Sequence, residues 1–428
     1  MSLPLRDRLG ALAERDFRLL FTATTITTVG DRMGGIALAF AVLDLPGGTA
    51  TDLGIVLGVR QGVNAAVVLA GGVVADRLPR NLVLTGASVV QGVAQAITAG
   101  LVLTGQASVA SLVVLAAVYG AGNAVVVPAE VGLVPQTVSP ARLQQANALQ
   151  GLSRNVVAVL GPAVGGVLVV AGSPGVALGV DAISFFASGA LLAQIRVPRR
   201  AERGTGFLRE LREGWTEFSA RTWLWSTVLL FGIGNLMFTS LFVLGPLVSK
   251  EDLGGPGAWA TILTAGGVGS VVGGVAAMRI RPSRPLLVSC IAPAPMVLQP
   301  LLLAAAAPVW AISTASFLAG AGLSVHLALW FTVFQREIPE HAQSRVSSYD
   351  ALGSFVFMPL GYALVGPIAA AIGTDETLVA AALIETACLA IILAIPSVWA
   401  IRAPSAAPAP AAAGSVELAA ASNERSTS

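Results

Sequence analysis

The sequence is poor in charge, in lysine, in histidine and in cysteine. Only 11% of its 428 residues are charged and 55% are hydrophobic, whereas soluble domains carry about 25% charged residues. Such an apolar chain cannot turn its whole surface to water, so the composition predicts a protein that crosses the membrane many times. The two cysteines, Cys290 and Cys388, lie in apolar runs. We expect them to pack as small buried side chains, without a disulfide or a metal.

The usual signatures of enzymes are missing as well. The only histidines are His326 and His341, and there is no H-E-x-x-H, no C-x-x-C and no G-x-x-x-x-G-K-[ST] phosphate loop. The run Gly266-Gly-Val-Gly269 lies inside an apolar span and not after a strand, so it is no dinucleotide fingerprint. We therefore expect no enzyme, no cofactor and no metal site. Without a nucleotide-binding domain, the energy for any transport would come from an ion gradient.

Long apolar runs are what the sequence does have. A helix needs about 20 apolar residues to cross a bilayer. The runs predict an all-α membrane protein with twelve transmembrane helices, at 17–43, 52–75, 81–104, 107–129, 143–171, 174–196, 222–248, 257–278, 284–306, 308–334, 346–371 and 375–401.

Arginine sets the orientation of these helices. Of the 25 Lys and Arg residues, only Lys250 is a lysine. If the N-terminus is cytoplasmic, 21 of the 25 lie on the cytoplasmic side, Arg32, Arg60 and Arg154 lie within spans, and only Lys250 lies outside. The positive-inside rule thus predicts an N-in, C-in topology. It also explains the arginines without nucleic-acid binding, and we expect no cleaved signal peptide.

A polar segment divides the twelve spans into two sets of six. The expected parts are a cytoplasmic N-terminus at 1–16, a six-helix bundle at 17–196, a cytoplasmic linker at 197–221, a second bundle at 222–401 and a disordered tail at 402–428. In the linker, Phe207, Leu211 and Trp215 share one face of a helix. This pattern predicts an amphipathic helix on the membrane surface, or a solvated linker helix with the same topology.

A charged cluster, Gly72-Val-Val-Ala-Asp76-Arg77-Leu-Pro79-Arg80, lies between the second and third spans. Its first part recurs as Gly274-Val-Ala-Ala-Met278-Arg279, at an offset of 202 residues, and Arg142 recurs as Arg345, at an offset of 203. The repeat predicts two parallel six-helix units. Because the second copy has Met278 in place of the acid, any contact of Asp76 is confined to one half.

This cluster resembles the G-x-x-x-D-R-x-x-R loop of the major facilitator superfamily, whose members are transporters with two six-helix halves. The resemblance runs from about Asp16 to Arg402 and narrows to the multidrug, macrolide and siderophore (enterobactin-exporter-like) branch. The segments that carry it are Arg15-Asp-Phe17-Arg18, Gly30-Asp31-Arg32, Ala146-Asn-Ala-Leu149, Gly161-Pro162-Ala-Val-Gly165-Gly166 and Phe207-Leu-Arg-Glu-Leu-Arg-Glu-Gly214. In one respect the chain departs from drug antiporters that carry an arginine in the fourth span, because Tyr119-Gly-Ala-Gly-Asn123 has none.

The resemblance implies roles for two groups of residues. A conformational latch would consist of Gly72, Asp76, Arg77, Arg80 and Arg142, with Asp76 at the N-terminal end of the eleventh helix, where the helix dipole favours an anion. An antiporter-type motif, which is typical of exporters, would consist of Gly161, Pro162, Gly165 and Gly166 and would allow close packing and bending of a moving helix. The simpler interpretations are topological arginines and ordinary helix packing.

Asp31 and Arg32 lie about halfway along the first span, where a charge costs at least a few kcal/mol unless it is paired or faces water. Arg60 in the second span is a possible partner for Asp31. We hypothesise that Asp31 is the carboxylate that couples proton uptake to drug release, with Arg32, Arg60 and His326 as further proton-coupling candidates. The alternatives are a static ion pair and, for His326, a buried core residue.

By the resemblance, the first, fourth, seventh and tenth helices line the transport cavity. Asn123, Asn235, Phe238 and Trp330 on such helices are therefore substrate-cavity candidates, because few polar groups among apolar walls suit amphiphilic drugs. Asp181 and Glu385 lie in the sixth and twelfth spans, which the resemblance makes scaffolding, so we expect structural roles for them.

Together these observations predict a multi-pass protein of the bacterial inner membrane that exports small amphiphilic compounds of the drug or antibiotic type by proton antiport. Its expected partners are the small-molecule substrate, protons and the lipid bilayer, with no nucleic acid, and the resemblance implies a monomer. Two alternatives stay open. One is an exporter of an endogenous metabolite or siderophore, and the other is a non-transporting membrane receptor on the same fold.

Overall fold

The computed structural model describes residues 10–196 and 214–403, with the backbone alone at 69–77, 340, 341 and 344. Within these ranges every element is helical. The N-terminal half contains η1 (Gly10–Ala13), α2 (Arg15–Leu43), α3 (Ala50–Arg77), α4 (Arg80–Leu103), α5 (Val109–Asn123), α6 (Val126–Thr137), η2 (Pro140–Arg142), α7 (Leu143–Ala171) and α8 (Pro174–Leu192). The C-terminal half contains α10 (Thr222–Glu251), α11 (Pro256–Ala277), α12 (Pro285–Ile291), η3 (Ala294–Val297), α13 (Leu298–Ala304), α14 (Val309–Glu337), α15 (Glu340–Phe355), α16 (Met358–Ile372), α17 (Thr374–Ala394) and α18 (Pro396–Ala400).

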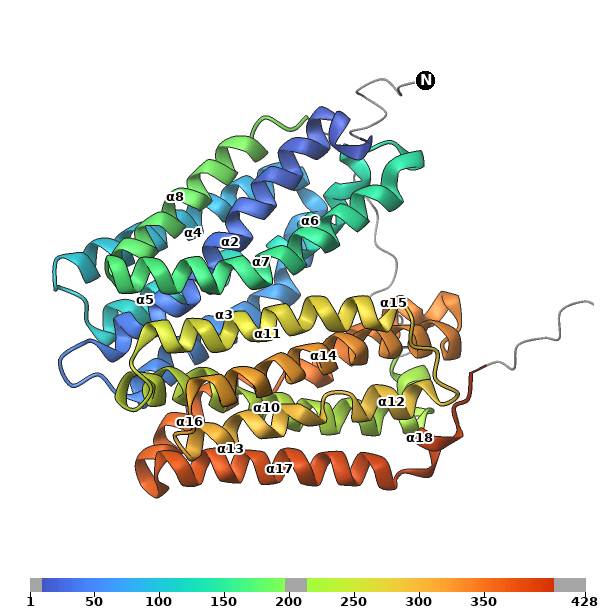
Figure 1. Cartoon of the computed structure of the whole chain (residues 1–428). Helices are drawn as coiled ribbons and strands as arrows, with labels where there is room; N and C mark the ends of the chain where they lie inside the picture. Colours follow the sequence, from blue (N-terminus) through green and yellow to red (C-terminus); the bar gives the residue numbers. More distant parts are fainter. Residues whose placement is uncertain (1–9, 197–213, 404–428) are drawn as a thin grey trace, which may run out of the picture.

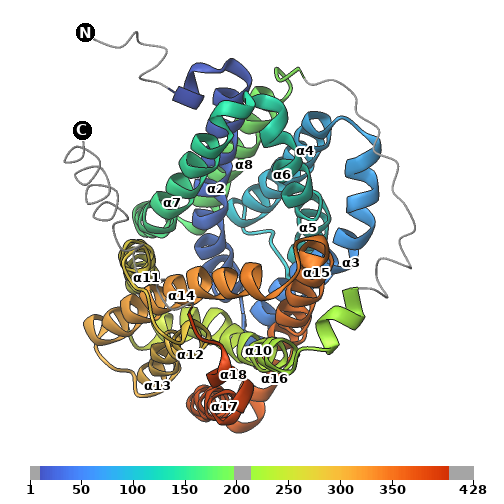
Figure 2. The same ribbon diagram turned by 90° about the vertical axis from the view of Figure 1, so that its right-hand side faces the viewer.

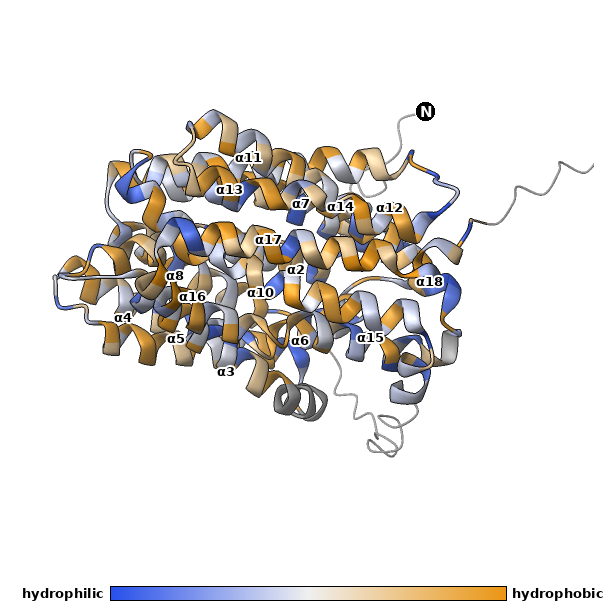
Figure 3. Ribbon diagram, turned by 90° about the horizontal axis from the view of Figure 1, so that it is seen from below, coloured by the Kyte–Doolittle hydropathy of each residue, from blue (hydrophilic) through white to orange (hydrophobic). Residues whose placement is uncertain are grey.

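Most of the helices are long enough to cross a membrane. Among the described residues, 11 helical segments have the length and apolar composition of a span. The predicted second span, which is not among these 11 segments, corresponds to α3, a helix of 28 residues. Together they give the twelve-helix all-α architecture that the apolar runs predict, and Figure 3 shows hydrophobic residues along the lengths of the helices.

Three expected spans are not the single uninterrupted helices that we predicted. The span expected at 107–129 is divided into α5 and α6, the one at 284–306 into α12, η3 and α13, and the one at 346–371 into α15 and α16. A proline ring clashes with the carbonyl group four residues earlier. Pro295 and Pro359 each stand four residues after the last residue of a helix, Ile291 and Phe355, and Pro128 stands four residues after Ala124, the residue that caps α5. Hydropathy alone does not register this backbone effect.

The helices form two bundles, which Figures 1 and 2 show above and below one another. In the first bundle α2 and α4 pack on α8, α2 also packs on α7, and α3 packs on α5. In the second, α11 packs on α14, while α10 and α13 pack on α17. The main contacts between the bundles are α7 with α11 and α3 with α16. The predicted amphipathic linker helix lies mostly outside the described residues, which resume at Gly214, and the tail beyond Ala403 lies wholly outside them.

Glycines mark the places where the two bundles touch. A Cβ atom on Gly166 of α7 would meet Ala260 of α11, and one on Gly366 of α16 would meet the backbone of Thr51 in α3. All four residues lie near the helix ends that point away from the described chain ends. We call these helix ends the outer ends and the opposite helix ends the inner ends. The bundles therefore meet at their outer ends, and Figure 1 shows them diverging toward the inner ends.

An ion pair crosses between the bundles at the outer side. The Nζ atom of Lys250, in α10, lies 2.7 Å from Oδ1 of Asp44, which caps α2. The same ammonium group donates a hydrogen bond to the carbonyl oxygen of Leu43, 2.5 Å away. Since the positive-inside rule places the inner ends in the cytoplasm, the structure is closed on the outside and has the inward-facing arrangement.

Candidate functional site

Three polar side chains from three helices meet inside the N-terminal bundle. Arg60 of α3 donates a hydrogen bond from Nη2 to Oδ1 of Asp31 in α2, over 2.7 Å. The hydroxyl group of Tyr119, in α5, donates to the same oxygen over 2.5 Å. The Arg60 guanidinium carbon lies 3.8 Å from the centre of the Tyr119 ring. The predicted contact between Asp31 and Arg60 is present, and a cation–π contact reinforces it.

The ion pair is unequally accessible. The Asp31 side chain is 45% exposed and that of Arg60 is 16% exposed, although both stand near the middle of their helices. Two donors on one oxygen, one of them cationic, favour the ionised carboxylate. Asp31 is thus an accessible carboxylate that an arginine and a tyrosine hold in place.

A glycine in the fourth span brings Tyr119 to this pair. A Cβ atom on Gly120 would collide with the backbone carbonyl group of Arg60, so only glycine lets α5 approach α3 this closely. The Tyr119 ring also packs edge-on against Phe185 of α8, with 5.6 Å between the ring centres. Sequence reasoning missed Tyr119, because a single tyrosine in an apolar run has no charge and no periodic pattern to distinguish it.

The antiporter-type motif packs directly against the site helix. Cβ atoms on Gly161 and Gly165 of α7 would meet Arg32 and Met33 of α2, while one on Gly166 would meet Ala260 of the other bundle. Pro162 is buried in the same stretch, and α7 continues through it as one helix. The motif thus lies where α2, α7 and α11 come together. Arg32 itself is exposed and is not part of the Asp31 hydrogen-bond cluster.

His326 lies in the C-terminal bundle, away from these groups. Its Nδ1 atom is 3.0 Å from both the hydroxyl oxygen and the carbonyl oxygen of Ser289. Its ring packs 4.6 Å from that of Phe231 and stacks on that of Trp330 at 6.1 Å. With 8% of its surface exposed, His326 is a hydrogen-bonded core residue in this arrangement, and the structure does not bring it to Asp31.

The four cavity candidates are spread over both bundles. Trp330 is buried and donates from Nε1 to Oδ2 of Asp350 in α15, over 3.2 Å. Asn235 donates to the carbonyl oxygen of Ser354, also in α15, over 2.8 Å.

The other two cavity candidates are half-buried. Phe238 packs edge-on against Phe242, with 5.2 Å between the ring centres. Asn123 lies at the end of α5. Asp350 and the ring of Trp223, which packs edge-on against Trp330 at 5.9 Å, are residues that sequence reasoning missed.

The latch residues can be followed only in part. The backbone of Gly72, Asp76 and Arg77 belongs to α3, but their side chains lie outside the described part of the structure. Arg80 donates to the carbonyl oxygen of Gly132 in α6, over 2.6 Å. This contact lies within the N-terminal half.

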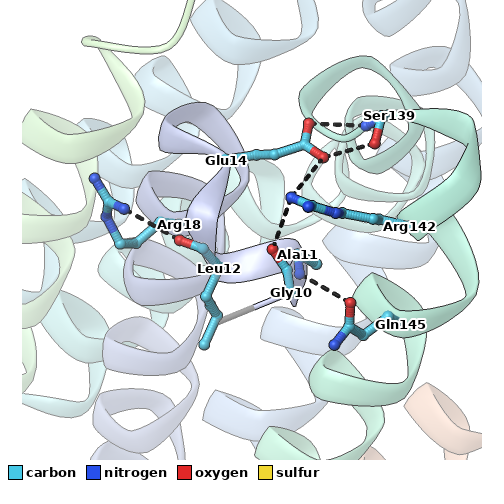
Figure 4. A network of polar contacts seen from close by, with 8 residues as sticks. All are labelled: Gly10, Ala11, Leu12, Glu14, Arg18, Ser139, Arg142 and Gln145. Carbon is cyan, nitrogen blue, oxygen red and sulfur yellow. Dashed lines mark hydrogen bonds and ion pairs between the residues drawn. The ribbon is translucent and has the colours of Figure 1, made fainter. Parts of the chain in front are cut away.

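Arg142 joins a network of polar contacts at the inner end of the N-terminal bundle (Figure 4). Its guanidinium group lies 3.7 Å from Glu14 and donates to the carbonyl oxygen of Gly10 over 3.0 Å. Glu14 also accepts hydrogen bonds from the backbone and the hydroxyl of Ser139, and Gln145 accepts one from the backbone of Ala11. The network ties η1 to the start of α7, so the segment before α2 is fixed to the bundle.

The chain belongs to the major facilitator superfamily. The model of that family, described as "Major Facilitator Superfamily", matches residues 20–361, which is most of the chain. No curated protein matches the sequence. Among the described residues, no group of three His, Cys, Asp or Glu side chains could hold a metal ion. The family and the fold identify a membrane transporter.

Solved structures of distant transporters share the fold. A bacterial homologue of the human lysosomal transporter Spinster, inward-facing and unoccupied, has 15% identity and a TM-score of 0.70, covering 95% of this chain and 100% of its own. The nucleoside transporter NupG has 10% identity and a TM-score of 0.67, covering 88% and 98%. A bacterial homologue of the iron transporter ferroportin, inward-facing, has 17% identity and a TM-score of 0.67, covering 88% and 98%. At these identities the likeness extends to the fold only.

Proposed function

We propose that the protein exports small amphiphilic compounds of the drug or antibiotic type across the bacterial inner membrane, as a monomer, in exchange for protons. One observation carries this proposal: Asp31 is a mid-membrane carboxylate that is 45% exposed while the bundles are closed at their outer ends. An antiporter needs such a group, because it must exchange a proton with the side to which the cavity opens. The ionised form, paired with Arg60, fits a carboxylate that is ready to exchange a proton with the cytoplasmic side.

The direction of transport rests on the antiporter-type motif. On α7, Gly161 and Gly165 pack against α2 next to Asp31, and Gly166 packs against α11. Movement of α7 between the bundles would therefore change the surroundings of the Asp31 carboxylate. We further propose that Asp76, Arg77, Arg80 and Arg142 close the inner ends when the outer ends open. The neighbouring structures are described as carriers of quite different solutes, so export of an endogenous metabolite or siderophore is the second candidate.

The test is proton flux into proteoliposomes with an imposed pH gradient, on addition of ethidium, a rhodamine dye, erythromycin or enterobactin. We expect at least one compound to drive proton movement with wild-type protein and none to do so with Asp31→Asn. Asp375→Asn is the matched control, because Asp375 is an exposed carboxylate at the start of α17 and should behave as wild type.

The panel also separates the candidate functions. A response to enterobactin alone favours the siderophore exporter over the drug exporter. Normal coupling in Asp31→Asn would remove Asp31 from the coupling path. Binding of a compound without movement of protons or solute would replace the transporter with a receptor on the same fold.

A further inference from the structure

A second carboxylate lies against the face of α2 that neighbours the face of Asp31. Asp181 of α8 has no exposed surface. Its Oδ2 atom accepts a hydrogen bond from Nε2 of Gln95, in α4, over 2.6 Å. The hydroxyl group of Ser184 is 3.4 Å from Oδ1 but donates mainly to the Asp181 backbone, over 2.7 Å. Both partners are neutral, so none of the hydrogen bonds described for this carboxyl group comes from a cation.

Two glycines on α2 make room for this carboxyl group. A Cβ atom on Gly30 would collide with Oδ1 of Asp181, and one on Gly34 with Oδ2. The two glycines are four residues apart and enclose the turn that begins with Asp31, so the Asp181 oxygens lie against the backbone of that turn. Asp31 follows Gly30 directly, and consecutive Cα atoms are about 3.8 Å apart. The two acids therefore lie close together on neighbouring faces of α2.

The ionisable groups around Asp181 are those of the candidate site. Asp31, Arg60 and Tyr119 are within electrostatic range of it. The other helices packed against α8 contribute little charge, because Arg80 at the start of α4 bonds to α6 and Arg154 of α7 is exposed. A buried carboxylate whose bonds all come from neutral donors is costly, and the neutral acid avoids this cost.

The internal repeat supplies a copy of this arrangement without the ion pair. Gln299 and Glu385 follow Gln95 and Asp181 at the same offset of 204 residues, and their helices, α13 and α17, pack together as α4 and α8 do. Gln299 is buried, and Oε2 of Glu385 is buried without a hydrogen-bond partner.

The two copies, Gln95 with Asp181 and Gln299 with Glu385, differ in the helix that packs beside the acid. The helix packed beside Glu385 is α10, which has no charged residue before Lys250 near its outer end. Both halves thus have a glutamine and an acid at matching positions, but of these two acids only Asp181 lies beside the candidate site.

We propose that Asp181 stores the transported proton, and that Asp31 passes this proton between Asp181 and water. This inference rests on the proton antiport proposed above. In the arrangement described here, Arg60 pairs with Asp31 and the proton is on Asp181. When Arg60 turns from Asp31 to Asp181, the Asp181 O–H bond breaks and an O–H bond forms on Asp31, so that one proton moves and the total charge is unchanged. Asp31 then releases the proton to the inner side, and uptake from the outside follows the same steps in reverse.

The first test asks where the proton is and needs no substrate. Infrared spectra of purified protein in nanodiscs at neutral pH would be compared for Glu385→Gln and for the double variant Asp181→Asn/Glu385→Gln. Removing Glu385 first takes one other partly buried acid out of the carboxylic-acid band, so that the two spectra differ only at Asp181. We expect the double variant to lose the intensity of one protonated carboxyl group. Equal bands in the two proteins would mean that Asp181 is ionised, which overturns the inference.

The second test asks whether this proton is transported, with the four compounds and the liposome assay described above. Asparagine has nearly the shape of aspartic acid and can still accept the Gln95 hydrogen bond, so Asp181→Asn should fold and exchange substrate across the membrane without a gradient. We expect it to lose proton-driven accumulation, whereas Glu385→Gln keeps both activities.

The outcomes of the second test are distinct. Normal coupling in Asp181→Asn, with a responsive wild type, would reject the storage role and leave the antiport proposal standing. Loss of accumulation in both Asp181→Asn and Glu385→Gln would show that removing either acid disturbs transport. This result would also reject the storage role of Asp181. A wild type that moves no protons with any of the four compounds would reject the antiport, and the storage role with it.

Discussion

The interiors of the two bundles contain different kinds of side chain on the same helical framework. In the N-terminal half the helices α2, α3, α7 and α8 place charged residues within their spans, at Asp31, Arg32, Arg60, Arg154 and Asp181. In the C-terminal half the corresponding space contains aromatic rings, which form a connected cluster of Trp223, Phe231, His326 and Trp330. Asp350, on α15, contributes a carboxylate at the edge of that cluster.

This difference suggests a division of labour. Charges inside a membrane protein are costly and are retained where ions or protons are handled, whereas large rings bind apolar molecules with little loss of conformational freedom. We therefore expect the N-terminal half to determine proton coupling and the C-terminal half to determine which compounds bind. Substitutions that affect one property and not the other test this division.

Removing Arg60 should have the largest effect. Arg60→Met leaves Asp31 without its cation. Because the Asp31 side chain is 45% exposed, we expect a cost below that of breaking a fully buried ion pair, about 3–5 kcal/mol, and above that of an exposed pair, about 0.2–1 kcal/mol. We expect the free energy of unfolding to fall by that amount at neutral pH. The loss should shrink as the pH is lowered, because protonation of Asp31 removes the uncompensated charge. Thermal unfolding in nanodiscs at several pH values would measure both effects.

The double variant Asp31→Asn/Arg60→Met is the control for this prediction. Without either charge, most of the lost stability should return, and the pH dependence should disappear. If the double variant were as unstable as Arg60→Met, the loss would come from packing of the arginine stem and not from the ion pair. The N-terminal interior would then be less dependent on charge than the comparison implies.

The matching substitution in the C-terminal half is Trp330→Phe, which keeps a ring but removes the donor to Asp350. Asp350 is half-buried, and losing a hydrogen bond to such a carboxylate costs about 1–3 kcal/mol. We expect a fall of this size in the free energy of unfolding and weaker binding of a responsive dye, measured by fluorescence. The number of protons moved per dye molecule should stay the same. A change in that number would contradict the division between the halves.

Sequence patterns identified the charged half better than the aromatic half. Asp31 and Arg60 could be matched because each is a charge at a similar depth in adjacent spans, and charges in such places need partners. The contact of Tyr119 with them depends on how closely Gly120 lets α5 approach α3, a distance that residue types do not encode. The aromatic cluster was likewise hidden, since rings are common in every span and nothing in their spacing distinguishes a cluster.

Other features had a signal in the sequence that was not used. The four-residue spacing of Gly30 and Gly34 indicates a face of α2 that a neighbouring side chain can approach, and Asp181 occupies it. The twelve-helix fold followed from apolar length and arginine placement. The helix breaks followed instead from single prolines such as Pro359, whose effect is local and independent of hydropathy.

A smaller effect is expected where the halves touch. Gly166→Ala adds a methyl group that would collide with Ala260 in the outside-closed state, and such overpacking costs about 1–3 kcal/mol. We expect this cost to shift the population toward the outward-facing state. Distances between spin labels on the outer ends of α2 and α10 would measure the shift.

Gly151→Ala is the matched control on the same helix. A Cβ atom on Gly151 would meet nothing within 4 Å, so this substitution adds helix propensity without a collision. It should leave the distances between the labels unchanged. Equal shifts in the two variants would mean that α7 responds to propensity and not to contact with the other half.

The smallest effect concerns the ion pair of Lys250 and Asp44. These side chains are 38% and 51% exposed, and exposed pairs contribute about 0.2–1 kcal/mol. Lys250→Gln should therefore shift the populations toward the outward-facing state by at most that amount, in the same spin-label assay. Salt screens an exposed pair, so wild-type protein in concentrated salt should approach the variant. A shift as large as that of Gly166→Ala would show instead that charge, and not packing, keeps the outer side closed.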